Sequence, residues 1–173
     1  MRADKGWSFR ARTASAAATR ELAARLAGVA RRGDVVVLQG PLGAGKTTFA
    51  QGFARGLGVE GPVTSPTFTL VRQYPCALGQ LVHVDVYRLD RLTEVADLGL
   101  ADLVEDGVAV VEWGDVARAA LAPVTLTVSI ARSGDAGSGT VPEGGTGDEE
   151  RDITVSGEDE SRRGEVAAAL GAR

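Results

Sequence analysis

The apolar positions form short runs whose spacing separates strands from helices. Residues 35–38 and 108–111 are continuous apolar stretches rich in valine, a pattern typical of strands that are buried on both faces of a sheet. Leu22 and Leu26 instead recur at helical spacing before Gly33, which predicts a helix. The alternation of strand and helix patterns along the chain predicts an α/β protein with a mixed sheet.

The same criteria assign the remaining segments. Strand patterns occupy residues 7–12, 34–39, 67–75, 79–89, 108–113, 123–131 and 151–157. Helical patterns occupy residues 15–32, 46–57, 93–104, 115–121 and 158–173. The turn-sized link at 76–79 predicts that the strands on either side of it form an antiparallel hairpin.

Length and composition limit the classes of protein that fit. A chain of 173 residues suits one domain with a hydrophobic core, so we expect a single domain over residues 1–173. At about 133–150 the composition becomes rich in glycine and acidic residues without a hydrophobic period, which predicts a flexible insertion. No apolar run approaches the roughly 20 residues of a membrane helix, and the N-terminus lacks the apolar core of a secretory signal. We therefore expect a cytoplasmic protein that does not contact membranes.

Charge argues against direct, tight binding of nucleic acid. The net charge is −4, and the sequence has no run of Lys or Arg that could neutralise several phosphates of DNA or RNA. The 19 basic residues include only two lysines, Lys5 and Lys46. Because arginine fills nearly every other basic position, the lysine at 46 is informative.

Lys46 lies in a complete phosphate-binding motif. Gly40, Gly45, Lys46 and Thr47 match G-x-x-x-x-G-K-[ST] between a predicted strand and a predicted helix. The glycines allow backbone N–H groups to turn towards phosphate, the lysine reaches the β and γ oxygens, and the threonine hydroxyl can bind Mg²⁺. The motif predicts nucleotide binding. The guanine-selecting N-K-x-D element is missing from the sequence, which favours ATP.

Two acids are candidates for a second magnesium ligand. Glu112 ends the apolar run 108–111 and precedes a helix, at the strand mouth where open α/β sheets bind ligands. Strand alternation places His83, Asp85 and Tyr87 on one face and the intervening valines on the other. The alternatives are that Glu112 caps the next helix, that Asp85 is a surface carboxylate, and that His83 is structural.

The turn between the glycine-loop helix and the hairpin carries hydroxyl groups. Thr64 and Ser65 precede Pro66, at a place suited to a nucleotide-sensing switch, although an ordinary connecting turn explains the pattern equally well. Trp113, beside Glu112, fits either the core or a site.

Several motifs together resemble a known family. "GPLGAGKTT", "VTSPTFTLVRQY", "HVDVYRL" and "VEWGD" occur in this order, with "DLGLADL" in the middle. They closely resemble the TsaE (YjeE) family, the small P-loop ATPases of tRNA threonylcarbamoyladenosine (t6A) biosynthesis, over residues 7–131. The resemblance implies a P-loop NTPase-like three-layer sandwich with a mixed, mainly parallel central sheet and an antiparallel hairpin.

The resemblance also implies a function. Such a protein binds and hydrolyses ATP with Mg²⁺, weakly when alone, and is required for t6A at position 37 of tRNAs that read ANN codons. Its partners are TsaB and TsaD, and TsaD performs the transfer. Since the chain is acidic, we expect these partners to make most of the tRNA contacts.

Site residues follow from the resemblance position by position. Catalysis is assigned to Asp85, Lys46 and Glu112, and the metal ion to Thr47 and Glu112. Ser65, Thr67 and Trp113 would sense the nucleotide or the partners. The nucleotide-binding residues are Gly43, Ala44, Gly45, Lys46, Thr47, Thr48 and, after the insertion, Arg151.

Three departures and two alternative functions accompany this interpretation. Pro41 stands where the family often has Asp, "EWGD" replaces "EWPE", and the long insertion leaves the assignment of Arg151 open. A small-molecule or nucleoside kinase shares the P-loop, but the insertion has no arginine between Arg132 and Arg151 to contact a transferred phosphate. A nucleotide-binding module without hydrolysis is the other alternative.

Overall fold

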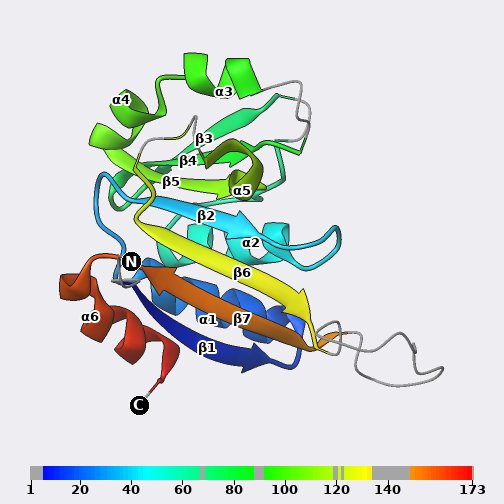
Figure 1. The fold of residues 1–173 in the computed structure, drawn as a ribbon. Helices are drawn as coiled ribbons and strands as arrows, with labels where there is room; N and C mark the ends of the chain where they lie inside the picture. The colour runs from blue at the N-terminus through cyan, green and yellow to red at the C-terminus, as the bar shows by residue number, and fades with distance from the viewer. Residues whose placement is uncertain are drawn as a thin grey trace, which may run out of the picture.

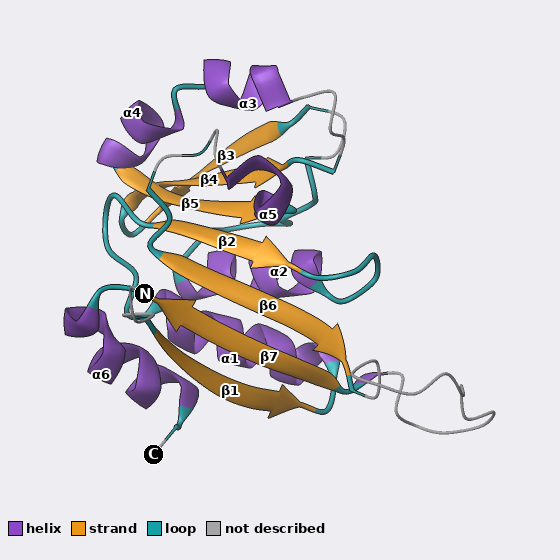
Figure 2. Ribbon diagram, viewed as in Figure 1, coloured by secondary structure: helices purple, strands orange, loops and turns teal. Residues whose placement is uncertain are grey.

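The chain folds around a seven-stranded sheet (Figures 1 and 2). The computed structural model describes residues 6–66, 69–87, 92–118, 121, 123–133 and 149–172. The strands are β1 (Trp7–Thr13), β2 (Val35–Gln39), β3 (Val71–Cys76), β4 (Gly79–Asp85), β5 (Gly107–Glu112), β6 (Leu126–Arg132) and β7 (Arg151–Gly157). The helices are α1 (Ala16–Ala27), α2 (Lys46–Gly56), α3 (Leu92–Asp97), α4 (Leu100–Glu105), α5 (Gly114–Ala117) and α6 (Glu160–Leu170). None of the described helices is long and apolar enough to cross a membrane.

The sheet is parallel in the middle and antiparallel towards its edges. Its order is β1-β7-β6-β2-β5-β4-β3. The neighbours β6, β2, β5 and β4 run parallel, whereas β3 pairs with β4, β7 with β6 and β1 with β7 in antiparallel fashion. This arrangement confirms the predicted α/β fold with its mixed sheet and the β3–β4 hairpin.

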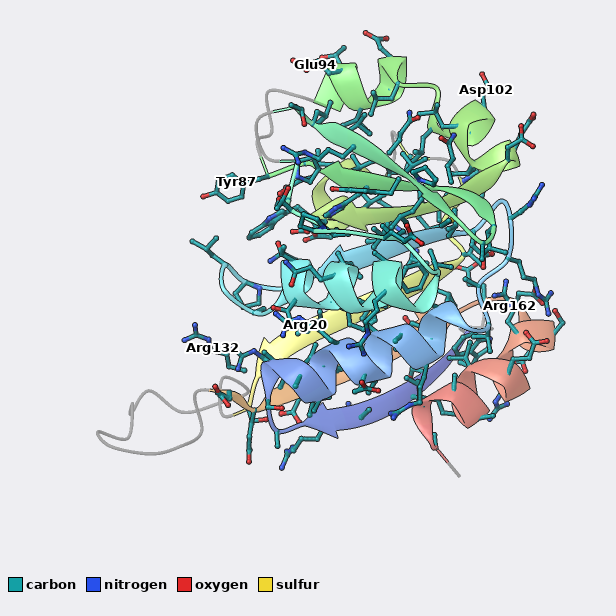
Figure 3. All side chains as sticks on the ribbon, turned by 180° about the vertical axis from the view of Figure 1, so that it is seen from behind. Arg20, Tyr87, Glu94, Asp102, Arg132 and Arg162 are labelled. Carbon is teal, nitrogen blue, oxygen red and sulfur yellow. The ribbon has the colours of Figure 1, made fainter. Side chains whose placement is uncertain are left out.

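Helices cover the two faces of the sheet unequally. Helices α1 and α2 lie behind the strands in Figure 1 and in front of them in Figure 3, and Phe49 and Phe53 of α2 pack there with Val36 of β2. On the other face, Leu100 and Val104 of α4 join a separate cluster that includes alternate residues of β4 and β5. In the described part of the chain, no helix covers this second face over β6, β7 and β1 (Figure 1). The third layer therefore spans only part of the sheet.

Several predicted elements have different bounds in the structure. The helix expected over 15–32 ends at Ala27, the strand expected over 79–89 ends at Asp85, the strand expected over 123–131 begins at Leu126, and the helix expected over 115–121 spans Gly114–Ala117. The helix expected over 93–104 is two helices, α3 and α4, because Gly99 between them adopts a left-handed conformation with φ of 59°. The strand expected from residue 67 begins at Val71, after Leu70 with φ of 66°. Thr67, which was predicted to lie in a switch, is outside the described residues.

A buried ion pair fastens the C-terminal helix to the rest of the fold. Arg162 of α6 is 3% exposed and donates hydrogen bonds from Nη1 and Nη2 to Asp34 Oδ1 and Oδ2, each at 3.0 Å. Its Nη2 also donates to the carbonyl of Val29 at 2.7 Å. Figure 3 shows Arg162 where α6 meets the end of α1. Hydrogen bonding to Asp34 raises the pKa of Arg162 above its usual value.

Strands β6 and β7 form a second hairpin. Arg132 pairs with Arg151 as the last register pair, and the amide of Ser133 donates to the carbonyl of Glu150 at 3.1 Å. The ends of the predicted insertion are thus held together by the sheet. Residues 134–148, which make up most of this insertion, are outside the described part of the chain.

Candidate nucleotide and metal site

The glycine loop connects the central strand β2 to helix α2. Gly40, Gly43 and Gly45 have φ values of 146°, 75° and 108°, which L-residues with side chains rarely adopt. At Gly40 a Cβ atom would stand 2.2 Å from the carbonyl oxygen of Ile130, so only glycine fits between the loop and β6. Helix α2 begins after Gly45 without a side-chain cap. Its first amides therefore point into the loop, in the arrangement that binds phosphate in other proteins.

Lys46 rests on the loop that it belongs to. It is 5% exposed, and its Nζ donates hydrogen bonds to the carbonyls of Gly40 and Pro41 at 2.8 and 2.9 Å. The ammonium also lies 3.6 Å from the centroid of the Trp113 ring, a cation–π contact. Burial lowers the pKa of Lys46 from its usual value, while the nearby carboxylates, first that of Glu112, oppose this shift.

Trp113 reaches Lys46 through an unusual backbone conformation. Its φ is 60°, in the left-handed region, and it precedes α5. Its ring also contacts the half-exposed ring of Tyr87, with centroids 5.3 Å apart. Trp113 thus contacts both Lys46 and Tyr87. Figure 3 shows Tyr87 at the end of the molecule where the glycine loop lies.

Asp85 and Glu112 end adjacent parallel strands. They are register partners on β4 and β5, and they are 6% and 2% exposed. The hydroxyl of Thr47 donates to Glu112 Oε2 at 2.9 Å. Glu112 therefore turns back towards the glycine loop, and no side chain among the described residues caps α5. Burial likewise argues against the alternative that Asp85 is a surface carboxylate.

The turn before the hairpin contacts Asp85 directly. Ser65 donates its hydroxyl to Asp85 Oδ2 at 2.5 Å, and the amide of Tyr87 donates to Asp85 Oδ1 at 3.0 Å. Thr64 accepts a hydrogen bond from Arg72 of β3 at 2.7 Å. The turn is thus linked both to the acid and to the neighbouring strand.

Arg151 approaches the loop from β7, which is separated from β2 by only β6 in the sheet. At the start of β7, its Nε donates to the carbonyl of Ala44 at 2.7 Å, and its Nη1 donates to the carbonyl of Glu150 at 3.0 Å. Arg151 therefore contacts the backbone of Ala44, and the Ala44 side chain is fully buried.

These residues surround a cleft of about 510 Å³. It is lined by Leu42, Gly43, Gly45, Lys46, Thr47, Thr48, Ser65, Asp85, Tyr87, Glu112, Trp113 and Arg151. All predicted site residues line it except Ala44, whose side chain points into the core, and Thr67, which is not described. Leu42, which is 74% exposed, and Tyr87 were not predicted as site residues. The alternation of β4 put Tyr87 on the face of Asp85, whereas Leu42 carried no signal beyond its place in the loop.

The donors at this cleft suit Mg²⁺. Among the described residues, no group of three or more His, Cys, Asp or Glu side chains could hold a metal ion by itself. Mg²⁺ bound with a nucleotide typically needs only one or two protein oxygens besides phosphates and water. The Thr47 hydroxyl and the Glu112 carboxylate are hard oxygen donors of this kind, 2.9 Å apart.

The sheet order and the loop between β2 and α2 define a P-loop NTPase-like protein. A sequence profile described as "Threonylcarbamoyl adenosine biosynthesis protein TsaE" matches residues 13–139. The chain belongs to the TsaE family.

Individual relatives agree with this assignment. The chain is 47% identical over 142 residues to the tRNA threonylcarbamoyladenosine biosynthesis protein TsaE of Streptomyces coelicolor, covering 80% of this chain and 89% of the relative. It is 43% identical over 125 residues to the Bacillus subtilis protein of the same name, covering 72% and 78%. The crystal structure of YdiB from Bacillus subtilis is similar, with a TM-score of 0.72, 34% identity and coverage of 96% of this chain and 95% of that one.

Proposed function

We propose that this protein is a magnesium-dependent ATPase that supports t6A formation at position 37 of tRNAs reading ANN codons. It acts in the cytoplasm on the TsaB–TsaD complex to sustain turnover, and it does not itself transfer the threonylcarbamoyl group. The observation that carries the proposal is the meeting of Lys46, Thr47, Asp85 and Glu112 around one cleft. The names of the relatives, each a tRNA threonylcarbamoyladenosine biosynthesis protein, support the pathway.

Each polar group at the cleft has a role in this proposal. Lys46 leaves the carbonyls of Gly40 and Pro41 and contacts the β and γ oxygens of ATP. Thr47 and Glu112 hold Mg²⁺, which supplies charge stabilisation to the phosphates. Asp85, whose Oδ2 accepts a hydrogen bond from the Ser65 hydroxyl in this structure, would orient the attacking water by accepting a hydrogen bond from it and would take up its proton as the water attacks the γ-phosphate.

Ser65 connects this chemistry to the partners. Its hydroxyl contacts the same carboxylate that would orient the water. Displacement of Ser65 by that water would move the turn around Pro66, which is the kind of ordered segment that signals nucleotide state in other P-loop proteins. The γ-phosphate is then a signal to TsaB and TsaD.

The base has a candidate position beside the loop. A small cavity of about 40 Å³ is lined by Ala16, Thr19, Gly45, Thr48, Glu149 and Arg151. It adjoins the N-terminal end of α2, and two of its residues, Ala16 and Thr19, lie within the first four residues of α1. A cavity of this volume is too small to enclose a whole base, so we assign one edge of the adenine to it.

Reconstitution tests the proposal. Purified TsaB, TsaD, tRNA and the threonylcarbamoyl-adenylate donor are combined with this protein, with and without ATP and Mg²⁺, and modified tRNA is counted per TsaD. We expect multiple turnovers only when the protein, ATP and Mg²⁺ are all present. Turnover that stays near one in every condition would contradict the function.

The Glu112→Gln variant tests the metal assignment. We expect the Mg²⁺ concentration for half-maximal ATP hydrolysis to rise at least about tenfold, because a charged oxygen donor is lost. ATP affinity measured without Mg²⁺ should change little. Glu105→Gln is the matched control, because Glu105 is an exposed residue at the end of α4. If the affinity for ATP falls equally with and without Mg²⁺, Glu112 has a structural role.

The Asp85→Asn variant tests the role in hydrolysis. We expect the hydrolysis rate to fall by about 100-fold or more, the lower end of general-base contributions. ATP affinity should remain within a few fold, since the amide oxygen can still accept from the Tyr87 N–H and the Ser65 hydroxyl can accept from the amide nitrogen. Single-turnover hydrolysis and equilibrium binding separate the two quantities. The exposed Asp97→Asn is the control, and a loss confined to binding would exclude the catalytic assignment of Asp85.

A further inference from the structure

His83 is a fully buried polar residue beside the metal ligand Glu112. It lies on β4, its register partners are Arg72 on β3 and Val110 on β5, and it is 0% exposed. Its Nε2 is 2.8 Å from Glu112 Oε1. Its other ring nitrogen, Nδ1, is buried and has no hydrogen-bond partner among the described residues.

The chemistry of the two groups fixes the direction of this hydrogen bond. An ionised carboxylate only accepts, so the proton lies on Nε2 of His83 and is donated to Glu112. Nδ1, with or without a proton, has no hydrogen-bond partner among the described residues. A buried polar atom without a partner disfavours folding. Stability alone therefore gives no reason for an imidazole here, whereas the N–H of Nε2 is aimed at Glu112.

Among the described residues, Glu112 has two side-chain hydrogen-bond donors, Thr47 and His83, and they differ in kind. Thr47 donates to both carboxylate oxygens, at 3.1 and 2.9 Å, but its own oxygen is needed for the metal. His83 contacts Glu112 Oε1 from the sheet and is not itself a proposed ligand of the metal. It is thus the donor that can hold the carboxylate in place whether or not Mg²⁺ is bound. Outer partners of metal ligands commonly set ligand orientation in this way.

We propose that His83 is a positioning residue that orients the Glu112 carboxylate for the Mg²⁺ of the bound nucleotide. This inference rests on the proposed function. It assigns to the "HVD" segment two separate duties: Asp85 faces the cleft, while His83, two residues earlier on the same face, supports the neighbouring strand's acid.

Two amide variants of His83 distinguish positioning from packing. The nitrogen of Gln stands as many bonds from Cβ as Nε2 does, so His83→Gln retains a donor for Glu112. The nitrogen of Asn corresponds to Nδ1 and falls short. The measurement is ATP affinity as a function of Mg²⁺ concentration, read with a fluorescent ATP analogue, together with affinity in the absence of Mg²⁺.

For His83→Asn we expect the half-saturating Mg²⁺ concentration to rise about tenfold or more, with metal-free affinity unchanged. His83→Gln should recover most of the wild-type value. Val84→Ala, on the opposite face of the same strand, reports packing loss and should leave the Mg²⁺ requirement unchanged. His83→Met supplies a second variant without the N–H, so the comparison does not depend on one variant folding.

A double-mutant cycle adds a second criterion. In the Glu112→Gln background, His83→Asn should cause little further rise in the Mg²⁺ requirement, since both changes affect one interaction. Equal Mg²⁺ requirements for the wild type, His83→Asn and His83→Met would overturn the inference. A wild-type protein whose ATP affinity does not respond to Mg²⁺ would instead contradict the proposed function.

Discussion

Replacing Lys46 with Met is expected to reduce ATP affinity by about 100-fold or more. The ammonium makes two hydrogen bonds to loop carbonyls in this structure, and we expect it to exchange them for phosphate oxygens. Hydrogen bonds to charged groups contribute about 1.5–3 kcal/mol each, so losing two of them corresponds to at least this change in affinity. Titration with a fluorescent ATP analogue in the presence of Mg²⁺ measures the effect.

A cation elsewhere on the same helix provides the control. Arg55 lies in the last turn of α2, half exposed, and forms an ion pair with Glu21 at 2.8 Å. Arg55→Met removes an equal charge and should leave ATP affinity within about twofold. Arg55 is nine residues along α2 from Lys46, a helical rise of roughly 13 Å, and exposed charges this far apart are largely screened. If both variants bind ATP like the wild type, the loop does not use Lys46 for phosphate and the proposed site is wrong.

Replacing Arg162 with Met is expected to destabilise the fold by about 3–5 kcal/mol, the usual cost of leaving one member of a buried ion pair unpaired. Both residues of the pair are at most 5% exposed. For a chain of this length, the loss corresponds to a fall in melting temperature of roughly 6–20 °C. Thermal and denaturant unfolding measure it.

A second substitution, at Asp34, tests whether the unpaired buried carboxylate causes the loss of stability. Asp34→Asn combined with Arg162→Met should recover part of the lost stability, because no isolated carboxylate remains buried. Arg163→Met, in the next residue of α6, where the side chain is exposed, should change the free energy of unfolding by less than about 1 kcal/mol. A loss from Arg163→Met as large as that from Arg162→Met would indicate that α6 tolerates no change and that the ion pair has no special role.

The sequence predicted the elements better than their ends. The valine runs of β2 and β5 are typical of buried strands and were correctly assigned, and alternation correctly placed Val82 and Val84 opposite His83 and Asp85. The division of one helix into α3 and α4 was missed, because a glycine within a helical pattern is compatible with either outcome until its φ is known.

Pairing between strands was the part that local patterns could not supply. The adjacency of β4 and β5 brings Asp85 and Glu112 together, and it follows from sheet order, which depends on packing across the whole chain. The same holds for the hydrogen bond from His83 to Glu112 and for the ion pair of Arg162 with Asp34. His83, Asp85 and Glu112 could be identified as candidates from the sequence, but their pairing could not, and neither Asp34 nor Arg162 carried a signal.

The β6–β7 hairpin makes the position of Arg151 independent of the length of the segment that connects the two strands. Because Arg132 and Arg151 are register partners and Ser133 bonds to Glu150, the sheet fixes where Arg151 meets the carbonyl of Ala44. Each doubling of a connecting segment costs only about 0.6 kcal/mol of closure entropy. Insertions between these strands can therefore grow or shrink in related chains at little thermodynamic cost, while the arginine stays in register with the glycine loop.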